Sequence, residues 1–247
     1  IFNTVKILWL IYVGFTLAVM FALRLSGLKF FDAINLSLTA ISTGGFAPYD
    51  ESIGYFAARP DLFPHYRCIE YVIIAGMLAG GINFFVHYRV LIGRIRALWD
   101  TEEIRLFWFI VASGAAFVTF DVLYHAPVGG SGNFEENFRS SLFQVVSVFT
   151  TTGFTTRDIS APGYYHGLSK QVFLLLMISG GCVGSTSGGI KLFRVRLLYK
   201  TLVAEVRRAV RPLRAVRVFK IDGDPIEDAE VLRAGALFFG WLLLITA

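Results

Sequence analysis

Long apolar stretches are the feature that most limits how this chain can fold. Residues 5–25 and 104–124 are long runs with few charges, and residues 71–92 come close to the same pattern. A helix of roughly 20 apolar residues spans the hydrocarbon core of a bilayer. The chain of 247 residues is also 55% hydrophobic and holds 24 phenylalanines, which is too apolar for a soluble domain of this length. We therefore expect an all-α membrane protein that contacts membrane lipid.

The positions of the basic residues indicate an orientation. When the apolar runs are threaded in order, 16 of the 23 Lys and Arg residues fall on the side where residues 5–25 begin, and 7 fall on the other. The positive-inside rule makes the first side cytoplasmic. One basic run follows an apolar helix, and we interpret it as a contact with anionic lipid headgroups rather than with nucleic acid. Its members are Arg207, Arg208, Arg211, Arg214 and Arg217.

The chain contains an internal repeat that is clearer in architecture than in letters. Each unit has an outer spanning helix, a short amphipathic segment, a glycine turn, a polar loop and a second spanning helix. Residues 1–95 form one predicted unit, with its second helix at 69–94, and residues 96–210 form the next. Residues 211–247 are predicted to be a cytoplasmic linker and the truncated first helix of a further unit. We expect the chain to be a fragment of a longer protein, because it opens without Met and closes inside an apolar run.

The short amphipathic segments predict the topology. Residues 30–41 and 138–149 are about 12 residues long, which suits a re-entrant helix better than a full span. A chain that enters halfway and turns back leaves backbone groups at membrane depth, and this is tolerated only where protein or a water-filled cavity surrounds them. The two segments therefore predict a pore or a binding cavity.

Each short segment is followed directly by hydroxyl residues and glycine. A dehydrated monovalent cation needs oxygen ligands, which backbone carbonyls supply without a full negative charge. Glycine accepts the unusual backbone angles that aim successive carbonyls at one axis. We predict an ion filter, with an ordinary loop as the alternative, and expect K⁺ at Thr43, Gly44, Thr151 and Thr152. The predicted filter residues are Ser42, Thr43, Gly44, Gly45, Thr151, Thr152, Gly153 and Phe154.

The last spanning segment of the second unit, from residue 171 to about 208, contains a Gly/Ser-rich stretch at residues 179–191. Each glycine in a helix interior costs about 1 kcal/mol relative to alanine, so the helix is predicted to break there. We favour a segment below the filter that opens or blocks the ion path; close helix packing through small residues is the alternative. A phosphate loop does not fit, because Ile190 separates Gly189 from Lys191. The gating candidates are Gly180, Gly181, Gly184, Ser185, Thr186, Gly188, Gly189 and Lys191.

Other polar residues give weaker signals. The four histidines, His65, His87, His125 and His166, form no pair at helical spacing, and the two cysteines are far apart, so no metal, haem or redox site is expected. No nucleophile and base are found together, and an enzyme is not expected. Asp50, Glu51 and Asp61 follow the first turn on the outside, where they are interpreted as solvated acids or as a weak attractor of cations. Arg157 and Asp158, after the second turn, are expected to pair.

Four strings carry a specific resemblance: STGGF, TTTGFTTRD, GGINFFVHYR and GGCVGSTSGGIKLFRV. Over nearly the whole chain the sequence resembles the Trk-type potassium transporters of bacteria, the TrkH-like branch of the superfamily that includes Ktr and plant HKT proteins. The resemblance implies four pore repeats around one path, of which this chain supplies the second, the third and the first helix of the fourth. It makes Gly45 and Gly153 the filter glycines and residues 180–191 an intramembrane gating loop.

The same resemblance implies the cellular setting. A homodimer is expected in the bacterial inner membrane, crossing it several times and working with a cytosolic nucleotide-binding ring of the TrkA kind. The transported ion is K⁺, no other cofactor is expected, and symport with Na⁺ or H⁺ is left open. An ion-coupled secondary carrier with discontinuous helices remains the alternative.

Overall fold

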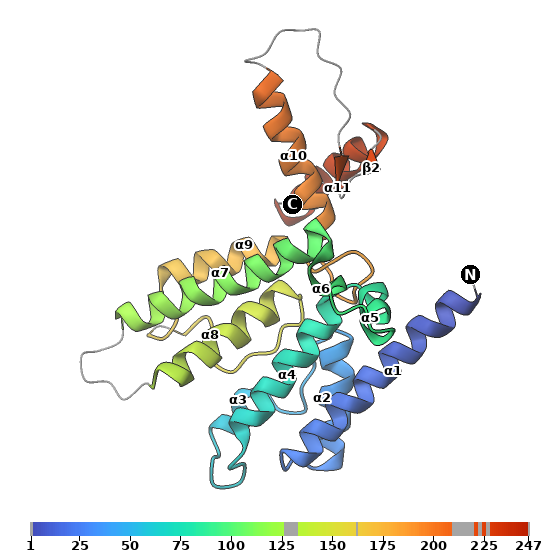
Figure 1. Cartoon of the computed structure of the whole chain (residues 1–247). Helices are drawn as coiled ribbons and strands as arrows, with labels where there is room; N and C mark the ends of the chain where they lie inside the picture. The colour runs from blue at the N-terminus through green and yellow to red at the C-terminus, as the bar shows by residue number, and fades with distance from the viewer. Residues whose placement is uncertain are drawn as a thin grey trace.

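The computed structural model describes residues 2–125, 133–161, 163–208, 220–221, 224–225 and 228–246, and it is helical nearly throughout (Figure 1). The helices are α1 Phe2–Leu25, α2 Phe30–Ile41, α3 Gly54–Ala57, α4 Tyr66–Gly81, α5 Phe84–Leu91, α6 Ala97–Asp100, α7 Glu102–His125, α8 Phe134–Phe149, α9 Gly167–Ile178, α10 Leu192–Arg208 and α11 Asp228–Thr246. Two short strands, β1 Lys220–Ile221 and β2 Asp224–Pro225, pair antiparallel. The all-α prediction is confirmed.

Helices α1 and α7 have the length and hydropathy of membrane spans, and the bent pair α4 and α5 adds a third candidate. Only 11% of the spanning window of α1 is buried inside the protein, and large side chains such as Trp9 and Phe21 point outward. Apolar side chains on an outer helix face suit a lipid environment, where burial against protein is not needed. The chain is thus a membrane protein.

Helix α2 begins and ends where the sequence predicted, and α8 extends four residues further toward the N-terminus than the predicted segment 138–149. The buried positions of α2 recur with helical spacing, and they face α1 and α4 (Figure 1). At 1.5 Å per residue, α2 is about 18 Å long, which is well short of a bilayer crossing. Helix α8 packs between α4 on one side and α7 and α9 on the other.

The prediction of a single helix at residues 69–94 is wrong. The helix is broken between Gly81 and Phe84, where α4 and α5 meet at an angle of 105°. The Asn83 side chain caps α5 by accepting a hydrogen bond from the Phe85 amide at 2.8 Å. Across the break, the buried His87 ring donates through Nε2 to the Ala79 carbonyl at 2.9 Å. The short helices α3 and α6 were likewise not predicted.

The segment after residue 208 is partly outside the described residues. Arg211, Arg214 and Arg217 of the basic run lie there, as does residue 226, where the third unit was predicted to begin. Helix α10 extends away from the main body, and α11 packs against it through a small cluster around Leu197 and Ala234 (Figure 1).

A buried ion pair joins the two repeats between α4 and α8. The Arg139 guanidinium donates through Nε to Glu70 at 2.5 Å, and both side chains are almost fully buried. The same guanidinium also binds Glu135, one turn earlier in α8. Removing one partner of a buried pair leaves an uncompensated charge, which costs far more than the pair contributes.

We expect Glu70→Ala to lower the free energy of unfolding by about 3–5 kcal/mol, because Arg139 then keeps only the more exposed Glu135. The measurement is the thermal unfolding midpoint of the full-length protein in detergent. Glu51→Ala is the matched control, since Glu51 pairs with Arg59 at the surface, and its midpoint should stay unchanged. Equal shifts for the two variants would contradict a structural role of the buried pair.

Candidate functional site

The turn after α2 reverses the chain through a compact set of backbone hydrogen bonds. The Ser42 amide still bonds in helical fashion to Leu38, at 3.0 Å. The Thr39 carbonyl then accepts from the amides of both Gly44 and Gly45, at 2.8 and 3.3 Å. The chain therefore leaves the helix end at once instead of continuing across the membrane.

The turn after α8 repeats this pattern atom for atom. Ser147 takes the place of Thr39, and its carbonyl accepts from the amides of Thr152 and Gly153 at 2.9 and 3.4 Å. The Ser147 hydroxyl adds a bond to the Phe154 carbonyl at 2.6 Å. The internal repeat predicted from architecture thus extends to individual hydrogen bonds.

Both turns carry the same pair of left-handed residues. Thr43 and Thr151 have φ values of 51° and 56°, and Gly45 and Gly153 have values of 69° and 90°. This region is unusual for a β-branched residue such as threonine, so the surrounding bonds must hold the conformation. Strained backbone of this kind is concentrated at ligand and switch sites, and here it occurs at the residues predicted to bind an ion.

The two turns touch through their backbones. A Cβ atom placed on Gly45 would lie 1.8 Å from the Thr152 carbonyl oxygen and 3.3 Å from the carbonyl carbon of Gly153. Glycine at position 45 is therefore required for the approach itself as well as for its φ angle. Residues far apart in sequence are brought together here from both repeats, as the filter hypothesis requires.

A second contact between the two repeats lies just beyond the turns, between residues 52–54 and Thr155. The amides of Ile53 and Gly54 both donate to the Thr155 carbonyl, at 3.0 and 3.1 Å, and the Thr155 amide donates to the Ser52 hydroxyl. A Cβ on Gly54 would lie 2.6 Å from the Thr156 carbonyl oxygen. Ser52 and Gly54 were not predicted from the sequence; the glycine at the first position of α3 was the available signal.

The predicted break of the last helix is confirmed, because α9 ends at Ile178 and α10 begins at Leu192. The intervening loop closes on itself. The Gly180 amide donates to the Ile190 carbonyl at 2.8 Å, and a Cβ on Gly180 would lie 1.8 Å from the Gly188 carbonyl oxygen. The glycines therefore allow close backbone contact within a loop, rather than the packing of one helix on another.

The loop also fills the gap between α4 and α5. The carbonyls of Gly80 and Gly81 accept hydrogen bonds from the amides of Thr186 and Cys182, each at 3.0 Å. In return, the Phe84 amide at the start of α5 donates to the Gly184 carbonyl at 3.1 Å. The two interrupted helices thus supply each other with the partners that their breaks remove.

Two residues of the loop, Thr186 and Gly188, contact the two turns. The Thr186 hydroxyl lies 2.8 Å from the Ile41 carbonyl and 3.0 Å from that of Gly80, and 3.4 Å from the hydroxyl of Thr43. The Gly188 amide donates to the Thr151 hydroxyl at 2.6 Å. The loop therefore lies against the end of both turns, and both contacts involve a left-handed threonine.

Lys191 closes the loop from the side of α10. Its ammonium group binds the Ser187 carbonyl and lies 3.3 Å from the Ser185 hydroxyl. The two serine hydroxyls are 2.7 Å apart. Of the eight gating candidates, Lys191, Ser185 and Thr186 make side-chain contacts within this network, whereas the glycines contribute backbone.

The charged residues beside the second turn are arranged differently from the expectation. Arg157 pairs with Glu136 of α8 at 2.5 Å and lies over the ring of Tyr164, so the predicted pair with Asp158 is wrong. Asp158 instead accepts hydrogen bonds from the hydroxyl and amide of Ser160, which lower the pKa of its carboxyl. A hollow of about 240 Å³ beside Thr156 is lined by both Arg157 and Glu136.

Of the acids after the first turn, Glu51 forms an ion pair with Arg59 at 2.7 Å. The hydrogen bond from Arg59 lowers the pKa of the Glu51 carboxyl. Its charge is thereby matched locally, which leaves Asp50 and Asp61 as the acids that could attract cations to this face.

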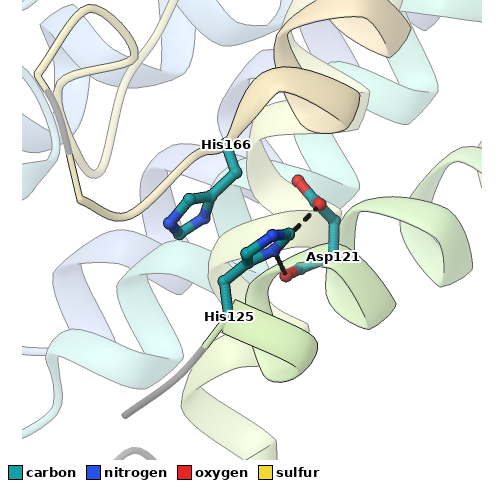
Figure 2. A group of neighbouring side chains, drawn as sticks. All are labelled: Asp121, His125 and His166. Atoms are coloured by element: carbon teal, nitrogen blue, oxygen red, sulfur yellow. Dashed lines mark hydrogen bonds and ion pairs between the residues drawn. The ribbon is translucent and has the colours of Figure 1, made fainter.

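Two of the histidines, which share no helical spacing in the sequence, meet in the fold. His125 at the end of α7 and His166 at the start of α9 stack with ring centroids 4.2 Å apart, and Asp121 lies one turn before His125 (Figure 2). The missed signal was the Asp–His spacing of four residues in an apolar helix.

Comparison with known proteins now places these features in a family. The family model TrkH, described as a cation transport protein, matches residues 1–247. The chain belongs to the TrkH family. A family of cation transport proteins agrees with the predicted transport class and with the prediction that the chain is not an enzyme.

Curated relatives and a solved structure match almost the whole chain. The Trk system potassium uptake protein TrkH of Escherichia coli K12 is 35% identical over 245 residues, which are 98% of this chain and 47% of that protein. An uncharacterized cation transporter of Methanocaldococcus jannaschii is 30% identical over 242 residues, or 98% and 45%. The crystal structure of the potassium transporter TrkH from Vibrio parahaemolyticus matches with a TM-score of 0.87 and 31% identity, covering 99% of this chain and 50% of that one. The chain thus spans about half the length of these relatives.

We expect Gly45→Ala to destabilise the protein more than Gly153→Ala or Gly93→Ala. All three glycines have positive φ, a strain of about 1–2 kcal/mol for alanine, but only at Gly45 would the new methyl meet a carbonyl oxygen. The measurement is the thermal unfolding midpoint of the full-length variants in detergent. The same midpoint for all three would show that the two turns do not touch.

Proposed function

We propose that this chain forms part of a channel-like pathway for potassium uptake across the bacterial inner membrane, which it crosses several times. The observation that carries the proposal is the backbone contact between the two repeated turns at Gly45 and Thr152. Two strained turns at one place bring main-chain oxygens from both repeats within reach of one dehydrated cation. The names of the relatives, potassium uptake proteins of the Trk system, support K⁺ as that cation.

In this proposal the eight turn residues, from Ser42 to Gly45 and from Thr151 to Phe154, line the filter, with K⁺ at Thr43, Gly44, Thr151 and Thr152. Equivalent aromatic residues follow both turns, yet Phe154 is fully buried whereas Phe46 is 80% exposed. Within this chain Phe154 is covered by neighbouring residues, whereas Phe46 is not. A further repeat of the complete protein that packs against Phe46 accounts for this difference. The proposal therefore places residues 1–95 and 96–210 among four repeats of the complete protein.

The loop at residues 180–191 is proposed to gate the path. It lies against the end of both turns through Thr186 and Gly188, so a movement of the loop that breaks these contacts separates it from the turns. We further propose that the complete protein is a homodimer controlled by a cytosolic nucleotide-binding ring of the TrkA kind, which acts on the gate from the α10 side.

The central test of the proposal is ion flux through the full-length protein in liposomes, with K⁺, Rb⁺ and Na⁺ compared. Gly153→Val should reduce K⁺ flux roughly tenfold or more, because the φ of 90° at Gly153 lies beyond the left-handed region that Thr43 and Thr151 occupy, and a β-branched residue does not adopt it. Gly93→Val is the matched control, since Gly93 has a similar φ of 89° in an exposed turn.

Unchanged K⁺ flux in Gly153→Val, with normal insertion, would refute the filter assignment. Uptake that saturates with an organic substrate, or that requires Na⁺ or H⁺ in fixed ratio, would favour a coupled carrier instead.

The gate makes a separate prediction. Thr186→Val removes the hydroxyl that donates to Ile41 and Gly80, which should weaken closure by about 1 kcal/mol and raise flux in the unactivated state about fivefold. Thr186→Ser retains the hydroxyl and should behave like the wild type. Lower flux in Thr186→Val, or equal effects of the two changes, would contradict the role of this contact in closure.

A further inference from the structure

The end of α7 meets the start of α9 in a group of three potential metal ligands. Asp121, His125 and His166 each offer one ligand atom, and these atoms lie within 4.8 Å of one another (Figure 2). The group lies at the end of the protein where α8 begins, far from the glycine-rich loop (Figure 1). The charge pattern of the sequence places this end on the external side of the membrane.

Asp121 is held in place by its surroundings. Its carboxylate is 2% exposed, and Oδ2 accepts from the amide and hydroxyl of Ser169 in the first turn of α9, at 3.0 and 2.5 Å. The other oxygen, Oδ1, lies 3.3 Å from Nδ1 of His125. Ser169 therefore orients the carboxylate as an outer-shell partner does at metal sites, while one oxygen still faces the histidines.

His125 donates through Nδ1 to the main-chain carbonyl of Asp121 at 2.9 Å, so Nε2 is the ring atom that remains available to a metal. The rings of His125 and His166 stack within 16° of parallel, with centroids 4.2 Å apart. Nδ1 of His166 is buried and has no hydrogen-bond partner among the described residues. A buried polar atom without a partner is unfavourable, and a bound ion would supply that partner.

We propose that Asp121, His125 and His166 bind a divalent transition-metal ion of the zinc class. Two imidazoles and one carboxylate form a ligand set typical of such ions, with a water completing the shell. Tetrahedral zinc needs ligand atoms about 3.4 Å apart, so the two imidazole rings must rotate out of their stacked arrangement to direct one nitrogen each at the ion. His166 precedes the first turn of α9 and His125 ends α7, so neither lies in a helix interior.

The bound ion would link the end of α7 to the start of α9. Helix α8, which carries the second turn at its end, packs against both α7 and α9. The link would therefore hold the helices around that turn in place without touching the ion path. The binding can be measured without ion flux, so it stands or falls independently of the potassium proposal.

The test uses the full-length protein without an affinity tag, stripped of metal with a chelator and titrated with Co²⁺ in detergent. We expect the visible absorption of tetrahedral or five-coordinate Co²⁺ at one ion per chain, displaced by Zn²⁺ but not by Mg²⁺ or Ca²⁺. His125→Gln and His166→Gln should each abolish the signal. His65→Gln, which changes an exposed histidine outside the group, should leave it intact.

A second readout guards against a variant that fails to fold. Zn²⁺ should raise the unfolding midpoint of the wild type and of His65→Gln, but not that of His166→Gln. No Co²⁺ absorption in the wild type, or an unchanged signal and an equal Zn²⁺ shift in His166→Gln, would overturn the proposal.

Discussion

Backbone groups at membrane depth have no water to bond with, and most of this structure follows from how they find partners. Helices α4 and α9 both stop inside the apolar region, which would leave amides and carbonyls without partners. The loop at residues 180–191 meets this need by donating to Gly80 and Gly81 and accepting from Phe84. One interrupted helix therefore requires the other, and the broken geometry is stable only as a pair.

The same arrangement sets the position of the strained turns. Thr43 and Thr151 keep left-handed φ angles because three sets of hydrogen bonds surround the turns: those at the helix ends, those to Thr155, and those from the loop at residues 180–191. Glycine at position 45 then lets the turns approach to backbone contact. In the proposed filter, fixed main-chain oxygens of these turns recognise the ion, and the loop that stabilises the turns also lies against their ends.

Much of this arrangement could be predicted from sequence, and the failures have physical causes. Helix α2 and the break before Lys191 follow from local patterns, namely apolar spacing and a dense run of Gly and Ser. The bend at Asn83 was missed because its flanks, including Gly80 and Gly81, still read as one apolar span. The meeting of His125 with His166 depends on how α7 packs on α9, and the pairing of Arg157 with Glu136 on how the second turn folds back on α8. No local pattern reports such contacts.

The most direct measurement of the central claim is the position of a heavy alkali-like ion in the complete protein. Crystals grown with Tl⁺ or Rb⁺ in place of K⁺ locate the ion by anomalous scattering. The account predicts a peak beside the main-chain oxygens of residues 43–45 and 151–153, lost on exchange with Na⁺. A protein that transports these ions but shows its anomalous peaks only away from both turns would contradict it.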